Sequence, residues 1–251
     1  MREPGVEREL EYLTLKAIGE SSQPVGSWGL RDELARLGIS LSEATAGRIL
    51  REMDKRGFTE RRGFRGRVLT PQGRERLEAL AREHRTSRNR KAFLDALRAH
   101  NREQLLEILE ARRAIESEVA RLAALRAGPD LLEEMGRVVD RHQAQVSGQR
   151  TGWQEDASFH RLLARAAGNR LLFAASELVR EEGQLSPVLE YIRGRVGSVM
   201  VADHRAILER VIARDPEGAA RSMARHIDNV IADVVRFWEQ NPEGQGENTS
   251  G

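Results

Sequence analysis

Three histidines and one aspartate interrupt apolar helix faces in the C-terminal part of the sequence. Asp156 and His160 are four residues apart in a segment whose hydrophobic residues recur at helical spacing. Both side chains therefore leave the helix on the face that also carries Trp153, Leu163 and Ala167, which we expect to be buried. A carboxylate and an imidazole would then point into the interior of the protein.

Two further predicted helices repeat this pattern with His204 and His226. Each of these histidines has a hydrophobic residue one helical turn away on either side. The flanking residues are Met200, Leu208, Met223 and Val230. Burying imidazoles and a carboxylate costs free energy unless they are bonded, and one divalent cation would bind all four side chains. We therefore predict that the aspartate and the three histidines form a metal site.

The composition limits the metal to nitrogen and oxygen ligands, because the chain has no cysteine. Zinc is the leading candidate, with nickel and manganese as alternatives. A metal that prefers octahedral geometry would keep about two positions for water or for a ligand carboxylate. The other histidines, His84, His100 and His142, lie in polar stretches, and we expect them at the surface.

The segments that carry the four residues are all predicted to be helical. From about Lys91 onward the sequence has no strand pattern, and Gly128-Pro129 and Asp215-Pro216 are strong helix boundaries. The expected helices are 91–99, 101–127, 130–146, 153–167, 169–182, 187–213 with a break near Gly194 to Gly197, and 216–238. The predicted fold class is therefore mainly α.

The N-terminal third has a different organisation. Helices are predicted at 7–20, 28–37, 42–56 and 71–83, and FTERRGFRGRVLT between the last two is typical of a hairpin turning at Gly63 and Gly66. Three helices and a hairpin make a winged helix-turn-helix, in which the third helix enters a major groove and the wing contacts phosphates.

Arginines crowd this region although the formal net charge of the chain is only +2. Such a basic surface is expected of a protein that binds the phosphate backbone. The predicted DNA-binding residues are Ser42, Glu43, Thr45, Arg48, Arg51, Arg61, Arg62, Arg65 and Arg67. A winged helix that makes only protein contacts is the alternative.

Length and composition fit two soluble domains. The chain has 251 residues, of which 32% are charged and 4% aromatic. We expect a winged-helix domain at 1–83, a basic linker at 84–91, a helical domain at 92–238 and a disordered tail at 239–251. No apolar run approaches the roughly 20 residues that cross a bilayer, and the start has no hydrophobic signal core. We therefore expect a cytoplasmic protein.

The C-terminal part resembles a known family. The runs EDASFHRLLARAAGN and HRAILERVIARDPEGAARSMARH are similar to the FCD (FadR C-terminal-like) effector domain of the GntR superfamily of bacterial regulators. The resemblance covers roughly residues 91–238. It implies an antiparallel helical bundle and a metal bound by an Asp-x3-His pair and two later histidines. The matching residues here are Asp156, His160, His204 and His226.

The same resemblance implies an effector pocket and a dimer. ILEARRAIESEVARLAA is similar to the family's opening helix, whose arginine commonly faces the effector and corresponds here to Arg112. Asn169, in AAGN, matches a family position beside the pocket. A small carboxylate effector could then bind the metal and the guanidinium together. Homodimers are the habit of this family, and two winged helices would meet two half-sites.

The N-terminal domain departs from the GntR pattern. The usual Pro-x-x-Arg-Glu-Ala-Leu core of the recognition helix is missing. SEATAGRILREMDKRGFTERRGFRGRVLTPQG instead resembles the winged helix of archaeal nitrogen regulators and of some ribonucleases. GntR operator rules are therefore not transferred to this chain.

These observations together predict a DNA-binding transcriptional regulator, not an enzyme, whose partners are double-stranded DNA and an organic acid. One alternative is a metal-dependent hydrolase that uses the same ligand set. Against it, no general base accompanies the ligands. A second alternative is a metal-free pocket in which the histidines bind the effector directly, and a third is an RNA-binding role for the winged helix.

Overall fold

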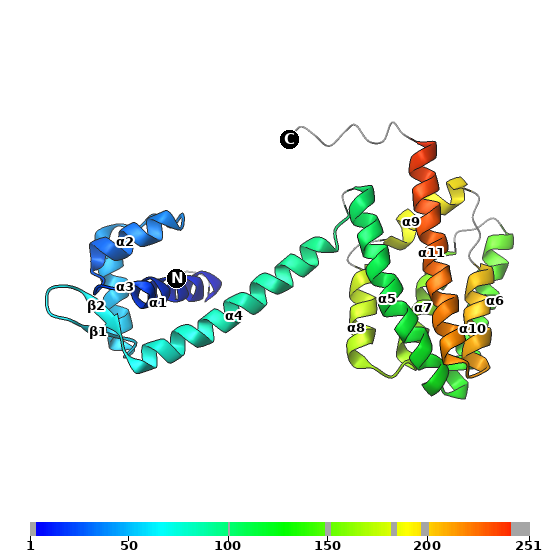
Figure 1. Ribbon diagram of the computed structural model, residues 1–251, viewed down its shortest axis with the longest axis horizontal. Coiled ribbons are helices and arrows are strands. Elements are labelled where there is room, and N and C mark those ends of the chain that lie inside the picture. Colours follow the sequence, from blue (N-terminus) through cyan, green and yellow to red (C-terminus); the bar gives the residue numbers. More distant parts are fainter. Residues whose placement is uncertain (1–3, 100, 149–151, 182–184, 197–200, 242–251) are drawn as a thin grey trace. The chain divides into compact units, whose positions relative to one another are not determined.

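The chain folds into two compact units, Met1–Ala92 and Phe93–Gly251 (Figure 1). The computed structural model describes residues 4–99, 101–148, 152–181, 185–196 and 201–241. His100, Met200 and the predicted tail from residue 242 lie outside these ranges. The predicted fold class, a winged helix followed by a helical bundle, is confirmed.

The first unit is a winged helix. Its elements are α1 (Pro4–Glu20), α2 (Ser27–Arg36), α3 (Glu43–Lys55), β1 (Thr59–Arg61), β2 (Arg67–Leu69) and α4 (Pro71–Ala96). The strands pair antiparallel with Glu60 opposite Val68, and Val25 adds a single bridge to Arg67. Leu15, Leu30 and Leu50 meet in the core between the helices and the hairpin. The hairpin is therefore fixed to the helices as a wing.

Side-chain caps set where α3 and α4 begin. The Ser42 hydroxyl accepts a hydrogen bond from the Thr45 amide at 3.2 Å. The Thr70 hydroxyl accepts one from the Gly73 amide at 2.9 Å. Gly73 also allows the wing to approach α4, since a Cβ there would lie 1.9 Å from the carbonyl oxygen of Phe58.

Helix α4 is longer than predicted. The separate helices expected at 71–83 and 91–99 are one helix, Pro71–Ala96, and the basic residues 84–91 lie within it. The segment EHRTSRNRK contains neither proline nor glycine, so its polar character alone does not end a helix. Whether residues 84–91 act as a linker remains a prediction.

The second unit is the predicted helical bundle. It contains α5 (Arg102–Arg126), α6 (Pro129–Ser147), α7 (Trp153–Ala166), α8 (Arg170–Glu181), α9 (Leu185–Val196), α10 (Val201–Ile212) and α11 (Pro216–Gln240). The long helices α5 and α11 lie side by side and run in opposite directions (Figure 1). Leu109, Phe159 and Ile227 belong to a core that all these helices surround. Among the described residues, no helix is long and apolar enough to span a membrane.

A buried carboxylate fastens the winged helix together. Glu11 of α1 accepts hydrogen bonds from Arg56, just after α3, at 3.0 Å and from Arg76 of α4 at 2.6 Å. Burial raises the pKa of Glu11, but the two guanidinium groups outweigh it and hold the pKa below its ordinary value. Glu11 is therefore ionised at neutral pH and links three helices.

We predict that Glu11→Gln lowers the free energy of unfolding of the winged helix by about 1–2 kcal/mol at pH 7. Because folding lowers the pKa of Glu11, its contribution is complete above the ordinary pKa of a glutamate and is lost as the pH falls further. The difference from wild type should therefore vanish in acid. Hydrogen exchange of α1 amides in urea measures this, with the exposed Glu7→Gln as control. An equal loss at all pH values would contradict the ionic role.

Candidate metal centre

The four predicted ligands converge in the middle of the bundle. Helix α7 contributes Asp156 and His160 from one face, α10 contributes His204, and α11 contributes His226. One oxygen or nitrogen atom from each of them lies within 4.8 Å of all the others. All four side chains are buried. The helical spacing in α7 and the adjacent packing of α10 and α11 produce this convergence.

The atoms that face one another have no hydrogen-bond partner among the described residues. They are Oδ1 of Asp156 and Nε2 of His160, His204 and His226. Oδ1 of Asp156 lies 3.4 Å from Nε2 of His204 and 3.8 Å from Nε2 of His160. Buried polar atoms without partners are strongly unfavourable. A divalent cation fits this donor set, because one oxygen and three nitrogens could all bind it.

The opposite edges of the rings have polar partners. The Nδ1 atom of His160 lies 2.6 Å from a carboxylate oxygen of Glu116, and Nδ1 of His226 lies 3.4 Å from Asp203. A carboxylate beside Nδ1 favours the proton on that nitrogen, which leaves the lone pair of Nε2 facing the centre. These rings are thus oriented as metal ligands.

Electrostatics favour the protonation states that bind a cation. Burial raises the pKa of Asp156, but Arg180, whose Nη2 donates to Oδ2 at 2.6 Å, and the nearby histidines hold the pKa well below its usual value. Burial lowers the pKa of His160 to about 4 and that of His226 to about 3. At neutral pH Asp156 is therefore a carboxylate, and His160 and His226 are neutral imidazoles.

Comparison with known proteins agrees with this architecture. Residues 107–229 match the family described as "FCD domain", and residues 13–77 match the "Ribonuclease R winged-helix domain". The chain is an FCD-domain protein of the GntR family. The FCD domain therefore contains all four residues of the buried Asp/His cluster.

Relatives match the two domains separately. The Uxu operon transcriptional regulator of Escherichia coli is 27% identical over 141 residues, 52% of this chain and 54% of that protein. The global nitrogen regulator NrpRI of Methanosarcina mazei is 38% identical over 73 residues, 29% of this chain and 22% of that protein. The chain thus spans about half, or less, of the length of these relatives.

A solved structure, E. coli McbR/YncC, covers 93% of this chain and 97% of its own, with 17% identity and a TM-score of 0.48. The names of the curated relatives describe regulators and not enzymes.

Arg112 is buried beside the cluster but does not reach it directly. Its Nε donates to Glu116 at 2.7 Å, and Glu116 also contacts His160 and Arg180. Burial raises the pKa of Glu116, but Arg112, His160 and Arg180 hold it well below the usual value. Arg112, the predicted effector arginine, thus contacts the predicted metal ligand His160 indirectly, through the carboxylate of Glu116. Glu116 is not among the predicted site residues, although it lies one helical turn after Arg112.

Asn169 lies at the start of α8. Its side-chain oxygen accepts hydrogen bonds from the amides of Leu171 at 3.0 Å and Leu172 at 3.2 Å. The structure therefore gives Asn169 a capping role, and its predicted contact with an effector stays a prediction.

Two further buried arginines border the cluster. Arg180 contacts Asp156, and the Nε atom of Arg193 lies 3.7 Å from Asp233. Among the described residues, Nη1 of Arg180 and Nε of Arg193 have no hydrogen-bond partner. Burial lowers the pKa of Arg193 to about 10, so it stays charged at neutral pH. The FCD domain therefore holds more positive charge beside the cluster than the sequence analysis predicted.

The expectation that His142 lies at the surface is wrong. It is 5% exposed, and its Nδ1 lies 3.3 Å from Nδ1 of His204. Met135, Val138 and Val139 precede it at helical spacing, a signal that its polar neighbours obscured. His84, by contrast, is partly exposed beside Glu9. The expectation that Trp153 is buried is also wrong, because this first residue of α7 is 37% exposed.

The predicted DNA-binding residues of α3 lie on its outer side. Arg48 and Arg51 are exposed, and Arg48 donates to the Thr45 hydroxyl at 3.1 Å. Glu43 accepts a hydrogen bond from the Ser27 hydroxyl at 2.9 Å, and Ser42 caps the helix. The two arginines are thus exposed basic groups of this helix that a polyanion could contact.

The arginines of the wing fall into two groups. Arg61, Arg62 and Arg65 are exposed around the hairpin tip. Arg67 is different, because only 14% of its side chain is exposed and its Nε lies 2.7 Å from a carboxylate oxygen of Asp54. This ion pair fastens β2 to α3, so Arg67 is not a free phosphate clamp in this structure.

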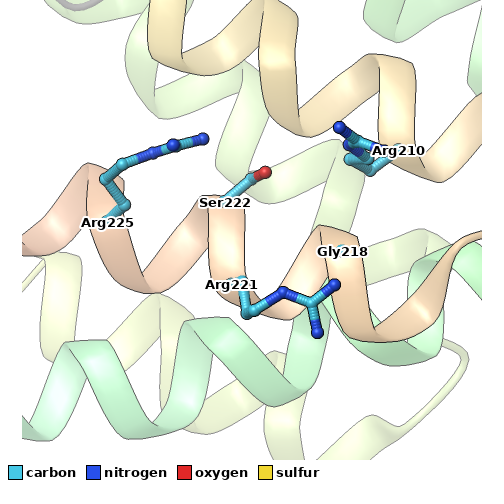
Figure 2. A pocket seen from close by; sticks show the side chains of 5 residues that line it. All are labelled: Arg210, Gly218, Arg221, Ser222 and Arg225. Atoms are coloured by element: carbon cyan, nitrogen blue, oxygen red, sulfur yellow. The ribbon is translucent and has the colours of Figure 1, made fainter.

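An open hollow lies on the surface of the FCD domain between α10 and α11. It is lined by Arg210, Gly218, Arg221, Ser222 and Arg225, and Figure 2 shows Arg221 and Arg225 leaving α11 in different directions. Arg225 directly precedes His226 in the sequence but is exposed. It is therefore a matched position for testing the buried cluster.

We predict that His226→Ala weakens binding of Zn²⁺ by at least about 100-fold, since a ligand atom is lost and second-shell losses alone cost 10–100-fold. Isothermal titration calorimetry of the metal-free protein measures the affinity. Arg225→Ala removes a charge from the same helix and should bind Zn²⁺ like wild type. Equal affinities for all three proteins would contradict the site.

We predict that His142→Ala weakens Zn²⁺ binding by about 10-fold, because Nδ1 of His204 loses the partner that orients its ring. His84→Ala, at a partly exposed histidine of the other unit, is the control and should leave the affinity unchanged. Loss of metal binding in both variants would show that the effect is not specific to the neighbour of His204.

Proposed function

We propose that this protein is a transcriptional regulator whose winged helix binds operator DNA and whose FCD domain binds a divalent metal and a small organic acid. The observation that carries the proposal is the set of four buried, unpartnered donor atoms within 4.8 Å of one another. Among the described residues, no side chain gives these atoms a hydrogen bond in this structure, whereas one cation would bind all four.

Asp156, His160, His204 and His226 would hold the metal, with zinc favoured and nickel and manganese as alternatives. When bound, the cation supplies positive charge that attracts an anionic effector. Glu116 and Asp203 keep the protons of His160 and His226 away from the centre. In the metal-free alternative, the histidines bind the effector directly. That alternative provides no partner for all four atoms, Oδ1 of Asp156 and the three Nε2 atoms.

The effector would be a carboxylate. Arg180 and Arg193 are buried near Asp156, where Nη1 of Arg180 lies 3.5 Å from Glu116 and Nε of Arg193 lies 3.7 Å from Asp233 without forming a full hydrogen bond. Guanidinium groups bind carboxylates with two parallel hydrogen bonds. One relative, 28% identical over 157 residues, is a putative L-lactate dehydrogenase operon regulatory protein of E. coli, and its name includes a small hydroxy acid.

DNA binding would use the exposed arginines of the first unit. Arg48 and Arg51 on α3 would face the major groove, and Arg61, Arg62 and Arg65 would contact phosphates from the wing. Arg67 does not belong to this set because it pairs with Asp54. A homodimer would place two such surfaces on a palindromic site.

Communication between the domains would involve α4. Leu80 of this helix belongs to the core of the winged helix, and Leu94 packs against the core of the bundle. An effector that prefers one arrangement of the bundle must change DNA affinity if that arrangement biases the position of α4. The basic residues 84–91 lie between these two anchor points.

We predict that the dimeric, metal-loaded protein binds palindromic duplexes, selected from a random library, with an affinity that falls steeply with salt and shifts when lactate or a related acid is added. Fluorescence anisotropy measures both effects. Arg180→Gln should abolish the response to the acid but not DNA binding in its absence. Equal affinity for selected and random duplexes would contradict the proposal, and preference for RNA would favour the alternative suggested by the ribonuclease-type winged helix.

A further inference from the structure

The tip of the wing exposes a phenylalanine completely. Phe64 has a relative exposure of 102%, the highest of the large hydrophobic residues that the structure describes as exposed. Its neighbours at the tip are arginines and glycines, and no apolar side chain stands beside it in the segment RRGFRGR. A fully buried phenylalanine is more favourable by about 1.5–3 kcal/mol than an exposed one. Burial of this ring against a partner would therefore stabilise a complex by a similar amount.

The backbone holds Phe64 in this position. The Arg62 amide donates to the Gly66 carbonyl at 2.8 Å, and the Arg65 amide donates to the Arg62 carbonyl at 3.2 Å. Gly63 and Gly66 have φ angles of 57° and 131°, which side chains with a Cβ rarely adopt. A Cβ on Gly66 would also lie 2.4 Å from the backbone of Val25. The turn is thus built to present the ring and is anchored at its base.

The surroundings indicate a polyanionic partner. Arg61, Arg62 and Arg65 flank the ring and are all exposed. Arg62 pairs with Glu60, and Nε of Arg61 donates to the Gly63 carbonyl, so both retain nitrogens for phosphates. A protein-docking face would require a contiguous apolar patch, which a single ring among arginines does not provide. An apolar side chain between basic residues is the arrangement that proteins insert between base pairs in the minor groove.

We propose that Phe64 is an apolar wedge that enters the minor groove of duplex DNA and partly unstacks one base step, while Arg61, Arg62 and Arg65 hold the adjacent phosphates. The inference rests on the proposed DNA-binding function and adds to it a bend in the operator. Pyrimidine–purine steps would be preferred at the contact point, because they unstack most easily. The wing would then select sequence through deformability, without hydrogen bonds to bases.

The test uses the full chain and duplexes of about 30 base pairs, selected by the wild-type protein and labelled at both ends for energy transfer. Wild type should shorten the end-to-end distance. Phe64→Ala should lose this change and bind about 10-fold more weakly, with an unchanged slope of log affinity against log salt. Phe64→Leu, which keeps an apolar wedge, should retain the bend. Arg65→Ala should retain the bend but reduce the salt slope by about 1.

The outcomes separate this inference from the proposed function. Wild-type protein that binds no duplex DNA would contradict the proposed function itself. Wild-type protein that binds DNA without bending it, or a Phe64→Ala variant that bends it fully, would overturn the wedge alone. Stronger binding of single-stranded RNA, with Phe64→Ala weakening it equally, would overturn the wedge in favour of stacking on unpaired bases. Because Phe64 is fully exposed, unchanged circular dichroism and melting temperature are expected for its variants.

Discussion

The need to satisfy four buried polar atoms that lie close together constrains the structure of the C-terminal bundle. Oδ1 of Asp156 and three imidazole Nε2 atoms face one another without hydrogen bonds among the described residues, inside an apolar core. Such an arrangement is costly unless a cation binds it. The surrounding charges are arranged accordingly. Arg180 neutralises the far oxygen of Asp156, and Glu116 bridges Arg112 and His160. Removing one member of such a buried network typically costs about 3–5 kcal/mol, because it leaves another charge unpaired.

The same cluster gives the helices a common centre. Helices α7, α10 and α11 each contribute ligands, α5 contributes Glu116 from the carboxylate network, and α6 contributes His142. The turn between α10 and α11 is fixed by Arg214, which has a φ of 56° and donates to the carbonyls of Ala124 and Ala127 at 3.2 and 2.6 Å. An effector that binds beside the metal would therefore act on several helices at once, which is what a sensor coupled to a DNA-binding domain requires.

Much of this organisation could be predicted from the sequence, because helical periodicity is a strong signal. Asp156 and His160 share a face at a spacing of four residues, and caps such as Ser42 and Asp215 mark helix starts. The residues that support the ligands could not be found in this way. Glu116 and Arg180 lie on different helices, so their pairing cannot be predicted from a spacing along the sequence. The apolar face that carries His142 was not recognised because the residues next to His142 are polar. The sequence does not distinguish Arg67 from the other arginines of the wing, because its ion pair with Asp54 joins β2 to a different element, α3. The length of α4 was missed because a polar, basic segment can be helical.

The central claim is that the unpartnered atoms are metal ligands. Anomalous diffraction at the zinc absorption edge, from crystals of the full chain equilibrated with Zn²⁺, tests it most directly. The account predicts one strong peak within bonding distance of Oδ1 of Asp156 and of Nε2 of His160, His204 and His226, at about 2.0–2.2 Å. The absence of a peak at this cluster in zinc-equilibrated crystals, or a peak ligated through the Nδ1 atoms, would contradict it.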